Sequence, residues 1–494
     1  MIFVENLLKK EVFKKMVDVK DFLSRRFDTQ IIENGKNQRM WLTWYRNNNA
    51  WREYYITLSN ERRSKKKVTR YSLNSCKRVC EDWANLLLNE KTDIVVSDEK
   101  QSTLNNELHK VLEENDFWTL GNKGIEKAWA LGAGAFVVGK DVMNDKITIE
   151  FVDGTRCYVL KCNSDDVIDC AFANTLIIKG KKYTTLNTHI QNEGGKGYKI
   201  YNFLFDDDGD LVSEEAMEEL IKVKAEDESR TKLFAFVTPQ NLATDNWDTP
   251  FADSVFAKAI DANKMIDLAF DSYCNEFILG KKRIFVASEL VRYRKDVVQQ
   301  NGVQKTVPVP VFDENEAVFN LLPEQSDGKT LIKEIDMGLR VEQHNAGIQD
   351  GLNFFASLCG LGEKYYKYDN GSVATATQIV SENSVLFRNI QKQQISIEKC
   401  LKELCNAIFD VMNVDVENAG EVTIQFDDSI IEDKDTERKR DLTDVDKGIM
   451  SKAEYRAKWY GETEEDAQKK IDEIEGAEEK EELNKNKSNE KYLI

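Results

Sequence analysis

The distribution of proline constrains this chain more than any other feature of its sequence. Only five prolines occur in 494 residues, and all of them lie between Pro239 and Pro323. Proline lacks a backbone donor and clashes with the preceding turn of a helix, so helix interiors and central strands exclude it. The proline-free first 238 and last 171 residues can therefore form long helices, and irregular connections are expected mainly in the middle.

Composition indicates a protein of several packed parts. Hydrophobic residues make up 41% of the chain and charged residues 32%, with a formal net charge of −18. Domains run to about 100–200 residues, so the length predicts about three packed units. No window offers the roughly 18 consecutive apolar residues of a membrane-spanning helix, so we expect no membrane partner. The start, MIFVENLLKKEVFKK, lacks the apolar run of a secretory signal, which favours a protein made inside the cell.

Cysteine and histidine give no sign of a metal or redox site. The nine cysteines include no C-x-x-C pair, and none of the three histidines lies at ligand spacing from another histidine or a cysteine. We therefore expect neither a metal ion nor a cofactor. Cys76 and Cys80, and likewise Cys400 and Cys405, lie in helical patterns beside apolar residues and are predicted to be reduced, buried thiols.

Apolar periodicity predicts helices on both sides of the proline-bearing middle. Two are expected at 72–88 and 103–112, and three more at 253–279, about 339–358, and 375 to about 412. The helix at 253–279 has its predicted buried stripe at Val255, Ala259, Ala262, Ile266, Ala269, Tyr273 and Phe277. The last helix has its stripe at Ile379, Leu386, Ile390, Ile397, Leu401, Leu404 and Ile408.

Strand patterns occupy two other regions, so the predicted class is α+β. Short β runs separated by turn residues predict antiparallel sheet from about residue 134 to 236. A second strand-rich stretch, 280–334, contains a hairpin signal at Asn301-Gly302, and Pro308 and Pro310 confine its last run to a sheet edge. A short strand at 422–426, helices from 433 to about 474 and a disordered charged tail at 476–494 complete the prediction.

The motifs that would indicate an enzyme are missing or incomplete. Asp206-Asp-Asp-Gly209 with Glu215 partly imitates a calcium-binding loop, but Leu204 occupies the first ligand position, so a hairpin turn is favoured. The Gly132-Ala-Gly134 and Gly360-Leu-Gly362 pairs lack a third glycine. Neither G-x-x-x-x-G-K-[ST] nor G-x-S-x-G occurs, so no enzymatic activity is predicted.

Two further patterns leave alternatives open. The aromatic cluster of Trp41, Trp44, Tyr45, Trp51, Tyr54 and Tyr55 could stack on bases, but core packing is favoured. The insert at 280–334 is locally basic within an acidic chain. A solvated sheet edge explains its charge about as well as a partner-binding surface does. Its basic residues are Lys281, Lys282, Arg283, Arg292, Arg294, Lys295 and Lys305.

Several colinear segments, spread over about residues 30–470, resemble the portal proteins of tailed bacteriophages, in the branch typical of long-tailed phages of Gram-positive hosts. The strongest runs from Thr249-Pro-Phe-Ala-Asp-Ser-Val-Phe256 through Tyr273-Cys-Asn-Glu-Phe-Ile-Leu-Gly280 to Val286. Another, Thr375-Ala-Thr-Gln-Ile379, is similar to the family's Thr-Ala-Thr-Glu-Val, with Gln378 in place of glutamate. Weaker segments are Trp44-Tyr45, Ala84–Glu90, Ile94–Val96, Ala130–Gly134, Lys182–Leu186 with His189, and Tyr198–Asn202.

The resemblance implies a mainly helical α+β portal fold with antiparallel β-structure in its wing and clip. The implied regions are a wing (1–250), a first stem helix (251–279), a clip (280–334) and a second stem helix (335–358). They continue with a tunnel loop (359–374), a long helix with a returning wing strand (375–426), and a crown with a charged tail (427–494).

The resemblance also implies a function. Twelve copies would form a ring around a channel at the portal vertex of the capsid, after assembly in the cytoplasm of the bacterial host. Double-stranded DNA would pass through the channel without sequence-specific contacts during packaging and ejection. The implied partners are the terminase large subunit, a head-completion or adaptor protein, and the major capsid and scaffolding proteins.

Two groups of residues are candidates for that function. Lys364, Tyr365, Tyr366, Lys367 and Tyr368 would contact the DNA backbone from a mobile loop with glycines at both ends. The seven basic residues of the insert would meet the terminase and later the adaptor. The alternatives are a minor head or scaffold protein without a channel, and an accessory subunit of a DNA-processing enzyme.

Overall fold

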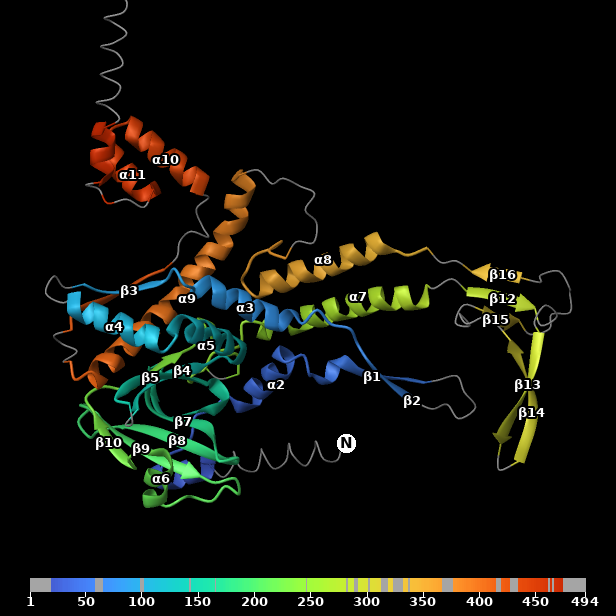
Figure 1. Cartoon of the computed structure of the whole chain (residues 1–494), viewed down its shortest axis with the longest axis horizontal. Helices are drawn as coiled ribbons and strands as arrows, with labels where there is room; N and C mark the ends of the chain where they lie inside the picture. The colour runs from blue at the N-terminus through green and yellow to red at the C-terminus, as the bar shows by residue number, and fades with distance from the viewer. Residues whose placement is uncertain are drawn as a thin grey trace, which may run out of the picture. The chain divides into compact units, whose positions relative to one another are not determined.

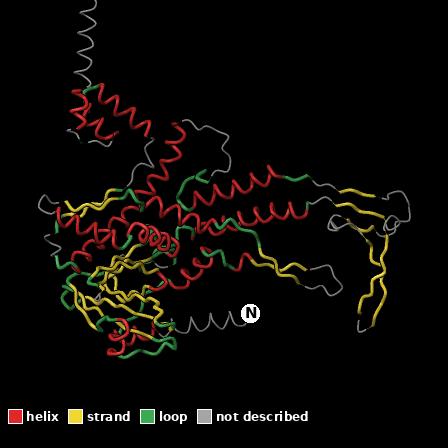
Figure 2. Tube along the Cα trace, viewed as in Figure 1, coloured by secondary structure: helices red, strands yellow, loops and turns green. Residues whose placement is uncertain are grey.

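The computed structural model of the chain forms two compact units, Met1–Ile424 and Gln425–Ile494, rather than the three predicted from length. Helices and sheets are mixed throughout the first unit, which confirms the α+β class (Figure 1, Figure 2). The structure describes residues 19–57, 65–97, 102–141, 144–164, 166–245, 247–280, 283–287, 292–300, 303–311, 319–322, 332–335, 338–366, 376–414, 419–426, 434–460, 463 and 466–473.

The N-terminal part of the first unit is mostly helical, as predicted. Residues 19–27 form a helix, and the helices predicted at 72–88 and 103–112 are confirmed with slightly different bounds. The exception is a two-stranded antiparallel hairpin between the first helices. The elements are α2 (Gly35–Tyr45), β1 (Glu53–Thr57), β2 (Lys65–Thr69), α3 (Ser75–Leu87), β3 (Asp93–Ser97), α4 (Ser102–Glu114) and α5 (Phe117–Leu131).

The predicted antiparallel region forms two sheets. A five-stranded sheet has the order β10-β9-β8-β7-β6, and a three-stranded sheet has the order β11-β4-β5. Their elements are β4 (Gly134–Asp141), β5 (Lys146–Asp153), β6 (Cys157–Asn163), β7 (Asp166–Ile178), β8 (Lys181–Gln191), β9 (Tyr198–Phe205), α6 (Glu214–Ile221), β10 (Glu226–Ser229) and β11 (Phe234–Val237).

The strands differ from the prediction in detail. Residues 171–172 and 176–178, which read as two separate short β runs in the sequence, are parts of one long strand, β7. Strand β8 was not predicted, because its polar sequence KKYTTLNTHIQ gives little apolar alternation. The turn predicted at Asp206 is confirmed: its carboxylate accepts the amides of Asp208 and Asp210, and Phe205 bridges to Leu211.

Apolar clusters cover both faces of the five-stranded sheet. Successive residues of a strand point to opposite faces, and Val159 and Leu160 accordingly belong to different clusters. The cluster that contains Leu160 is closed by Leu23 of the N-terminal helix. The cluster that contains Val159 is closed by Phe234 of β11. The sheet is therefore packed between the N-terminal helix and the smaller sheet.

Helices α7 (Ile260–Leu279) and α8 (Val341–Leu358) lie side by side, as predicted for two helices that bracket an insert (Figure 1). Gly351 allows their close approach, because a Cβ atom at this position would lie 2.9 Å from Cγ1 of Ile266. The pair leads into the strand-rich insert at one end and into the loop after Leu358 at the other.

The prediction that the first of these helices begins at Asp253 is wrong. Residues 257–259 form a 3-10 turn, and the α-helix begins only at Ile260. Upstream, Asp253 accepts a hydrogen bond from the amide of Thr244 (3.2 Å), and the amide of Val255 donates to the carbonyl of Trp129 (3.0 Å). These contacts hold the segment in an extended turn that is incompatible with helical hydrogen bonding.

The predicted apolar stripe on α7 is also wrong in part. Val255 lies outside the helix, and Phe277 is 47% exposed. The buried face instead includes the polar residues Asn263, Asp267 and Asp271 around Ile266. These polar residues recur every four positions and so form a stripe as regular as the apolar one. A search for apolar periodicity alone does not detect this polar stripe.

The insert between the helix pair contains two small sheets. A three-stranded sheet has the order β15-β12-β16, in which β15 runs parallel to β12, an exception to the predicted antiparallel pairing. A separate antiparallel hairpin joins β13 and β14, and its register closes at Gln300 and Val303, around the predicted turn. Asn301 and Gly302 themselves lie outside the described residues. The strands are β12 (Arg283–Ala287), β13 (Arg292–Gln300), β14 (Val303–Val311), β15 (Phe319–Leu322) and β16 (Ile332–Ile335).

The long helix α9 (Ala376–Val411) confirms the prediction closely. Of the predicted stripe, Leu386 and the five residues after it are buried, whereas Ile379 lies outside the residues whose side chains are described. Strand β17 (Glu421–Gln425) pairs with β3.

The second unit contains helices α10 (Lys434–Asp446) and α11 (Lys452–Tyr460). Its buried Asp441 accepts hydrogen bonds from Lys458 and Trp459. The tail at 476–494 lies outside the described residues. None of the helices in the described part of the chain combines the length and the apolar character needed to cross a bilayer.

Candidate functional site

The segment after α8 begins with a tightly turned backbone. Gly360 and Gly362 both have positive φ angles, of +83° and +89°, and Lys364 follows with +65°. A side chain at Gly360 would also meet Asn389 at 3.3 Å. The left-handed backbone therefore favours glycine at both turns, and at Gly360 a side chain would also press against Asn389.

Hydrogen bonds from three helices hold the start of this loop. Trp83 in α3 donates its indole N–H to the carbonyl of Cys359 (3.1 Å), and Asn389 in α9 donates to the carbonyl of Gly360 (2.7 Å). Gln349 in α8 donates to the carbonyl of Tyr366 (2.6 Å). Backbone carbonyls of a loop near the surface are usually hydrated, so three side-chain donors indicate a fixed position.

Tyr366 is an anchor of the loop in this structure. Its hydroxyl donates to Oδ2 of the buried Asp82 (2.7 Å), and Arg78 pairs with the same carboxylate (3.1 Å). Burial, together with the Asp82 charge, raises the pKa of Tyr366, so the hydroxyl keeps its proton and remains a donor. The ring of Tyr365 packs edge-on against Tyr366, and burial raises the pKa of Tyr365 to about 12.

The five predicted loop residues therefore differ in their surroundings. Lys364 is exposed, Tyr365 is only 36% exposed, and Tyr366 is half-buried, whereas Lys367 and Tyr368 lie outside the described residues. Sequence reasoning missed Asp82, Trp83 and Gln349 as supports of the loop. The available signal for Asp82 was a carboxylate next to Trp83 on the apolar face of α3, which requires a buried donor.

A small polar cavity of about 90 Å³ lies beneath the loop start. It is lined by the end of α8, the segment before α7, and side chains of α3 and α9. Asp253, Lys258 and Lys392 contribute its charged groups. In the part of the chain that the structure describes, no cluster of three or more histidine, cysteine or carboxylate side chains is arranged to hold a metal ion.

The predicted basic residues of the insert fall on two sheets. Arg283 begins β12, whereas Arg292, Arg294 and Lys295 are in β13 and Lys305 is in β14. In the hairpin register Lys305 pairs with Val298 and Lys295 with Pro308. Lys281 and Lys282 lie outside the described residues. Four of the seven basic positions thus share one hairpin.

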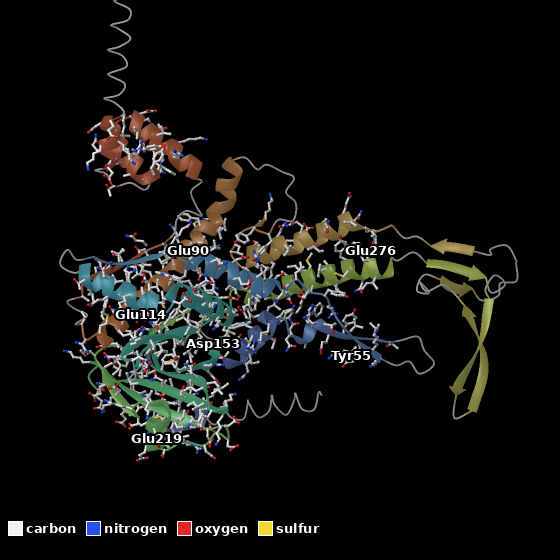
Figure 3. All side chains as sticks on the ribbon, viewed as in Figure 1. Tyr55, Glu90, Glu114, Asp153, Glu219 and Glu276 are labelled. Atoms are coloured by element: carbon white, nitrogen blue, oxygen red, sulfur yellow. The ribbon has the colours of Figure 1, made fainter. Side chains whose placement is uncertain are left out.

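Glu276 joins the two helices where they lead into the insert. Its carboxylate accepts three hydrogen bonds from Arg340, at 2.8, 3.2 and 3.0 Å, and one from the His344 ring. These donors, first the Arg340 side chain, lower the pKa of Glu276 to about 2. Figure 3 marks Glu276 near the end of α7. The ring of Tyr273 packs against His344 at 5.3 Å.

The middle of α7 meets the segment that follows β2. Asp271 accepts the amide of Tyr71 (3.0 Å), and Asp267 is completely buried beside Asn263 (3.3 Å). Burial raises the pKa of Asp267 to about 6, although Ser72 and the nearby arginines oppose this shift. This face of α7 is therefore held by polar contacts.

The thiols and most of the aromatic cluster serve packing. None of the nine cysteines, all of which lie among the described residues, is in a disulfide. Seven of them are buried, including the four predicted to be, Cys76, Cys80, Cys400 and Cys405. Trp41 and Trp44 are buried, which confirms core packing for these two. Tyr55 does not follow the prediction, since it is 65% exposed.

Comparison with known protein families decides the assignment. A family model described as phage portal protein, SPP1 Gp6-like, matches residues 25–490. The chain belongs to this family. The resemblance inferred from sequence is thereby confirmed. Phage portal proteins are structural components of the virion, not enzymes, and this portal protein is placed at the portal vertex of the capsid.

Three solved structures similar to this portal chain come from gene transfer agent (GTA) particles. A chain from the neck of an empty GTA particle, computed with C6 symmetry, is 9% identical, with 87% of this chain and 94% of that chain covered and a TM-score of 0.45. The neck of the native particle, computed with C12 symmetry, gives 9% identity and a TM-score of 0.39 at the same coverage. The native virion gives 10% and 0.38, again at this coverage. None of the curated protein sequences compared with the chain matches it significantly.

Proposed function

We propose that copies of this portal protein, twelve in the assembled virion, close into a ring whose channel passes double-stranded DNA during packaging and ejection. The family match over residues 25–490 is the observation that carries the proposal. In this proposal the ring docks the terminase large subunit during packaging, and head-completion or adaptor proteins afterwards. The major capsid and scaffolding proteins surround it at the vertex.

Exposed apolar side chains on the helix pair support a ring of subunits. Met265 and Leu268 of α7 are 42% and 51% exposed, and Phe354 and Leu358 of α8 are 58% and 50% exposed. Apolar groups gathered on one pair of helices are typical of surfaces that another protein covers. In a ring, the neighbouring copies would cover them.

The charge of the chain supports sliding of the DNA. At −18 for each copy, a ring of twelve carries about −216 formal charges, so much of its lumen repels a duplex. Because tight phosphate pairing would slow the passage of DNA, only a few cationic contacts are compatible with rapid movement. We assign these to Lys364 and Lys367, with Tyr365 and Tyr368 beside them. Tyr366 is assigned to anchoring the loop instead.

The regions of the family fold are assigned as follows. The wing comprises residues 1–250, the stem helices 251–279 and 335–358, and the clip 280–334. The tunnel loop comprises 359–374, the long helix with the returning strand 375–426, and the crown 427–494. Within the clip, the β13–β14 hairpin, with Arg292, Arg294, Lys295 and Lys305, is the proposed docking element for the terminase and the adaptor.

Electron microscopy of the purified chain tests the ring directly. We expect circular particles with a central hole. Monomers or filaments alone, both in solution and in phage heads, would contradict the proposal and favour a minor head or scaffold protein. Assays of the pure protein for ATPase and nuclease activity separate the ring from a DNA-processing enzyme, and we expect neither activity.

The channel contacts have their own test. Lys364→Ala/Lys367→Ala should reduce the amount of DNA retained per particle several-fold, because two backbone contacts per copy are lost around the ring. Lys181→Ala/Lys182→Ala, at the exposed start of β8, removes the same charge elsewhere. If the loop variant packages DNA normally, Lys364 and Lys367 do not contact the DNA in the channel.

A similar comparison tests the clip. Arg292→Glu/Arg294→Glu/Lys295→Glu should leave rings intact but reduce their binding of the terminase at least tenfold. Unchanged terminase and adaptor binding would show that the β13–β14 hairpin is not the docking element.

A further inference from the structure

The hairpin of β1 and β2 leaves most of its side chains exposed. Tyr55 is 65% and Ile56 39% exposed, and the facing strand begins with the exposed lysines 65–67. Figure 3 shows Tyr55 on this hairpin, away from the sheets. An isolated two-stranded hairpin is only marginally stable in water, so it gains from packing against a further surface.

The root of the hairpin is nevertheless firmly fixed. The guanidinium of Arg70 lies 4.1 Å from the ring centroid of Trp51 and 4.5 Å from that of Tyr54. Arg52 donates to the carbonyl of Arg70 (3.0 Å), and Tyr71 is hydrogen-bonded to Asp271 of α7. The hairpin is therefore held at its root in a defined direction, with Tyr55 and Lys65 on one of its faces and Ile56 and Lys66 on the other.

Helix α8 carries an exposed stripe of similar length. Ala346, Asp350, Phe354 and Leu358 follow one another at four-residue steps, and all four are exposed. At 1.5 Å per residue the stripe extends for about 18 Å. A five-residue strand extends for about 17 Å. Near the stripe, Gly347 leaves open space, since a Cβ atom there would meet no other atom within 4 Å.

We propose that the β1–β2 hairpin of one copy packs across the α8 stripe of the adjacent copy. Tyr55 supplies an aromatic group for Phe354 and Leu358. Lys65 pairs with Thr57 and so lies on the same face of the hairpin as Tyr55, where it supplies a cation for Asp350 or for Glu342, which is exposed one turn before Ala346. The apolar and charged groups of the hairpin thus complement those of the α8 stripe, and the two surfaces have similar lengths. The inference rests on the proposed ring and names the element that joins its subunits.

The composition of the hairpin favours a protein surface over nucleic acid. Glu53 forms an ion pair with Lys67 (2.6 Å), which offsets one of the three lysine charges. Ile56 has no π-face for stacking on a base, and a phosphate backbone offers it no apolar contact. The competing hypothesis is that the hairpin binds DNA, and the experiment below distinguishes it from the proposed contact between subunits.

Charge reversal on the hairpin tests the contact. Lys65→Glu/Lys66→Glu should lower the fraction of chain in rings at least tenfold, measured by mass photometry at fixed concentration. Lys181→Glu/Lys182→Glu makes the same change in charge on another exposed hairpin and should leave the ring fraction unchanged. Equal thermal unfolding of both variants and the wild type establishes that each chain is folded. If the first variant forms rings normally and instead retains less DNA, the proposal is overturned.

Disulfide formation between two different chains tests the geometry. One chain carries Tyr55→Cys and the other Ser357→Cys, an exposed position beside the α8 stripe. After mixing and mild oxidation we expect a disulfide-linked heterodimer on non-reducing gels, and none from either chain alone. Wild-type rings without this cross-link would refute the hairpin contact and leave the proposed function standing. A wild-type chain that never forms rings would refute both.

Discussion

Gly132 ends α5 in the left-handed conformation, with φ of +74°, directly against another segment of the backbone. A Cβ atom built on this residue would lie 2.0 Å from the carbonyl oxygen of Ala252, and the amide of Ala252 donates to the carbonyl of Gly132 (3.0 Å). The residue thus connects the end of α5 with the segment that leads to α7.

Gly132→Ala should therefore lower the free energy of unfolding by at least about 3 kcal/mol, because conformational strain and a backbone clash add. Gly180→Ala is the matched control, since Gly180 has φ of +79° but open space around it. It should cost only about 1 kcal/mol. Equal losses in chemical denaturation would show that the approach of Ala252 has no energetic consequence.

Glu276 makes a pH-dependent contribution to stability. Its pKa in the folded chain is about 2, below the ordinary value of 4.5, so the stabilisation is complete above pH 4.5 and is lost as the pH falls towards 2. Glu276→Gln should lower the melting temperature at pH 7, with a difference from wild type that narrows steadily below pH 4.5. If the difference in melting temperature between wild type and Glu276→Gln does not change with pH, Glu276 stabilises the fold by packing and not by its charge.

Among the elements, α9 is tied to the β10–β11 connection by a buried carboxylate. Asp410 accepts the backbone amides of Arg230 (2.9 Å) and Thr231 (2.8 Å), and the Arg230 side chain (2.8 Å). Asp410→Ala should cost about 3–5 kcal/mol, because it leaves these donors without an acceptor. On the same helix, Glu398 pairs with Lys402 in solvent, and Glu398→Ala should cost less than about 0.5 kcal/mol. A similar loss for both in urea denaturation would contradict the assignment.

The elements also show how much of the fold was predictable from sequence. Helix α9 was predicted because its aliphatic stripe is the surface it buries. The start of α7 was mispredicted because Asp253 and Val255 form long-range hydrogen bonds that local periodicity does not encode. Strand β8 was missed because its polar residues pair through the backbone. The loop after α8 was found from its glycines and tyrosines, but its anchor Asp82 is 284 positions before Tyr366 and no local pattern connects them.

At the scale of the whole molecule, the division into two units has a direct consequence. The first unit, Met1–Ile424, contains both apolar clusters on the sheet and the helix pair. A chain ending at residue 427 should therefore unfold cooperatively within about 3 °C of the corresponding transition of the full chain. Loss of that transition in calorimetry would show that residues 428–494 are required for the fold of the first unit.

Glu276 also determines how a mechanical load on the insert is shared. The chain enters the insert after α7 and leaves it before α8, and the Arg340 and His344 contacts fasten these two crossing points together. Tension applied to the strands of the insert is thus expected to reach α7 and α8 together, along the helix axes. The Glu276 contacts therefore couple the two connections of the insert, so we expect tension on either connection to reach both helices.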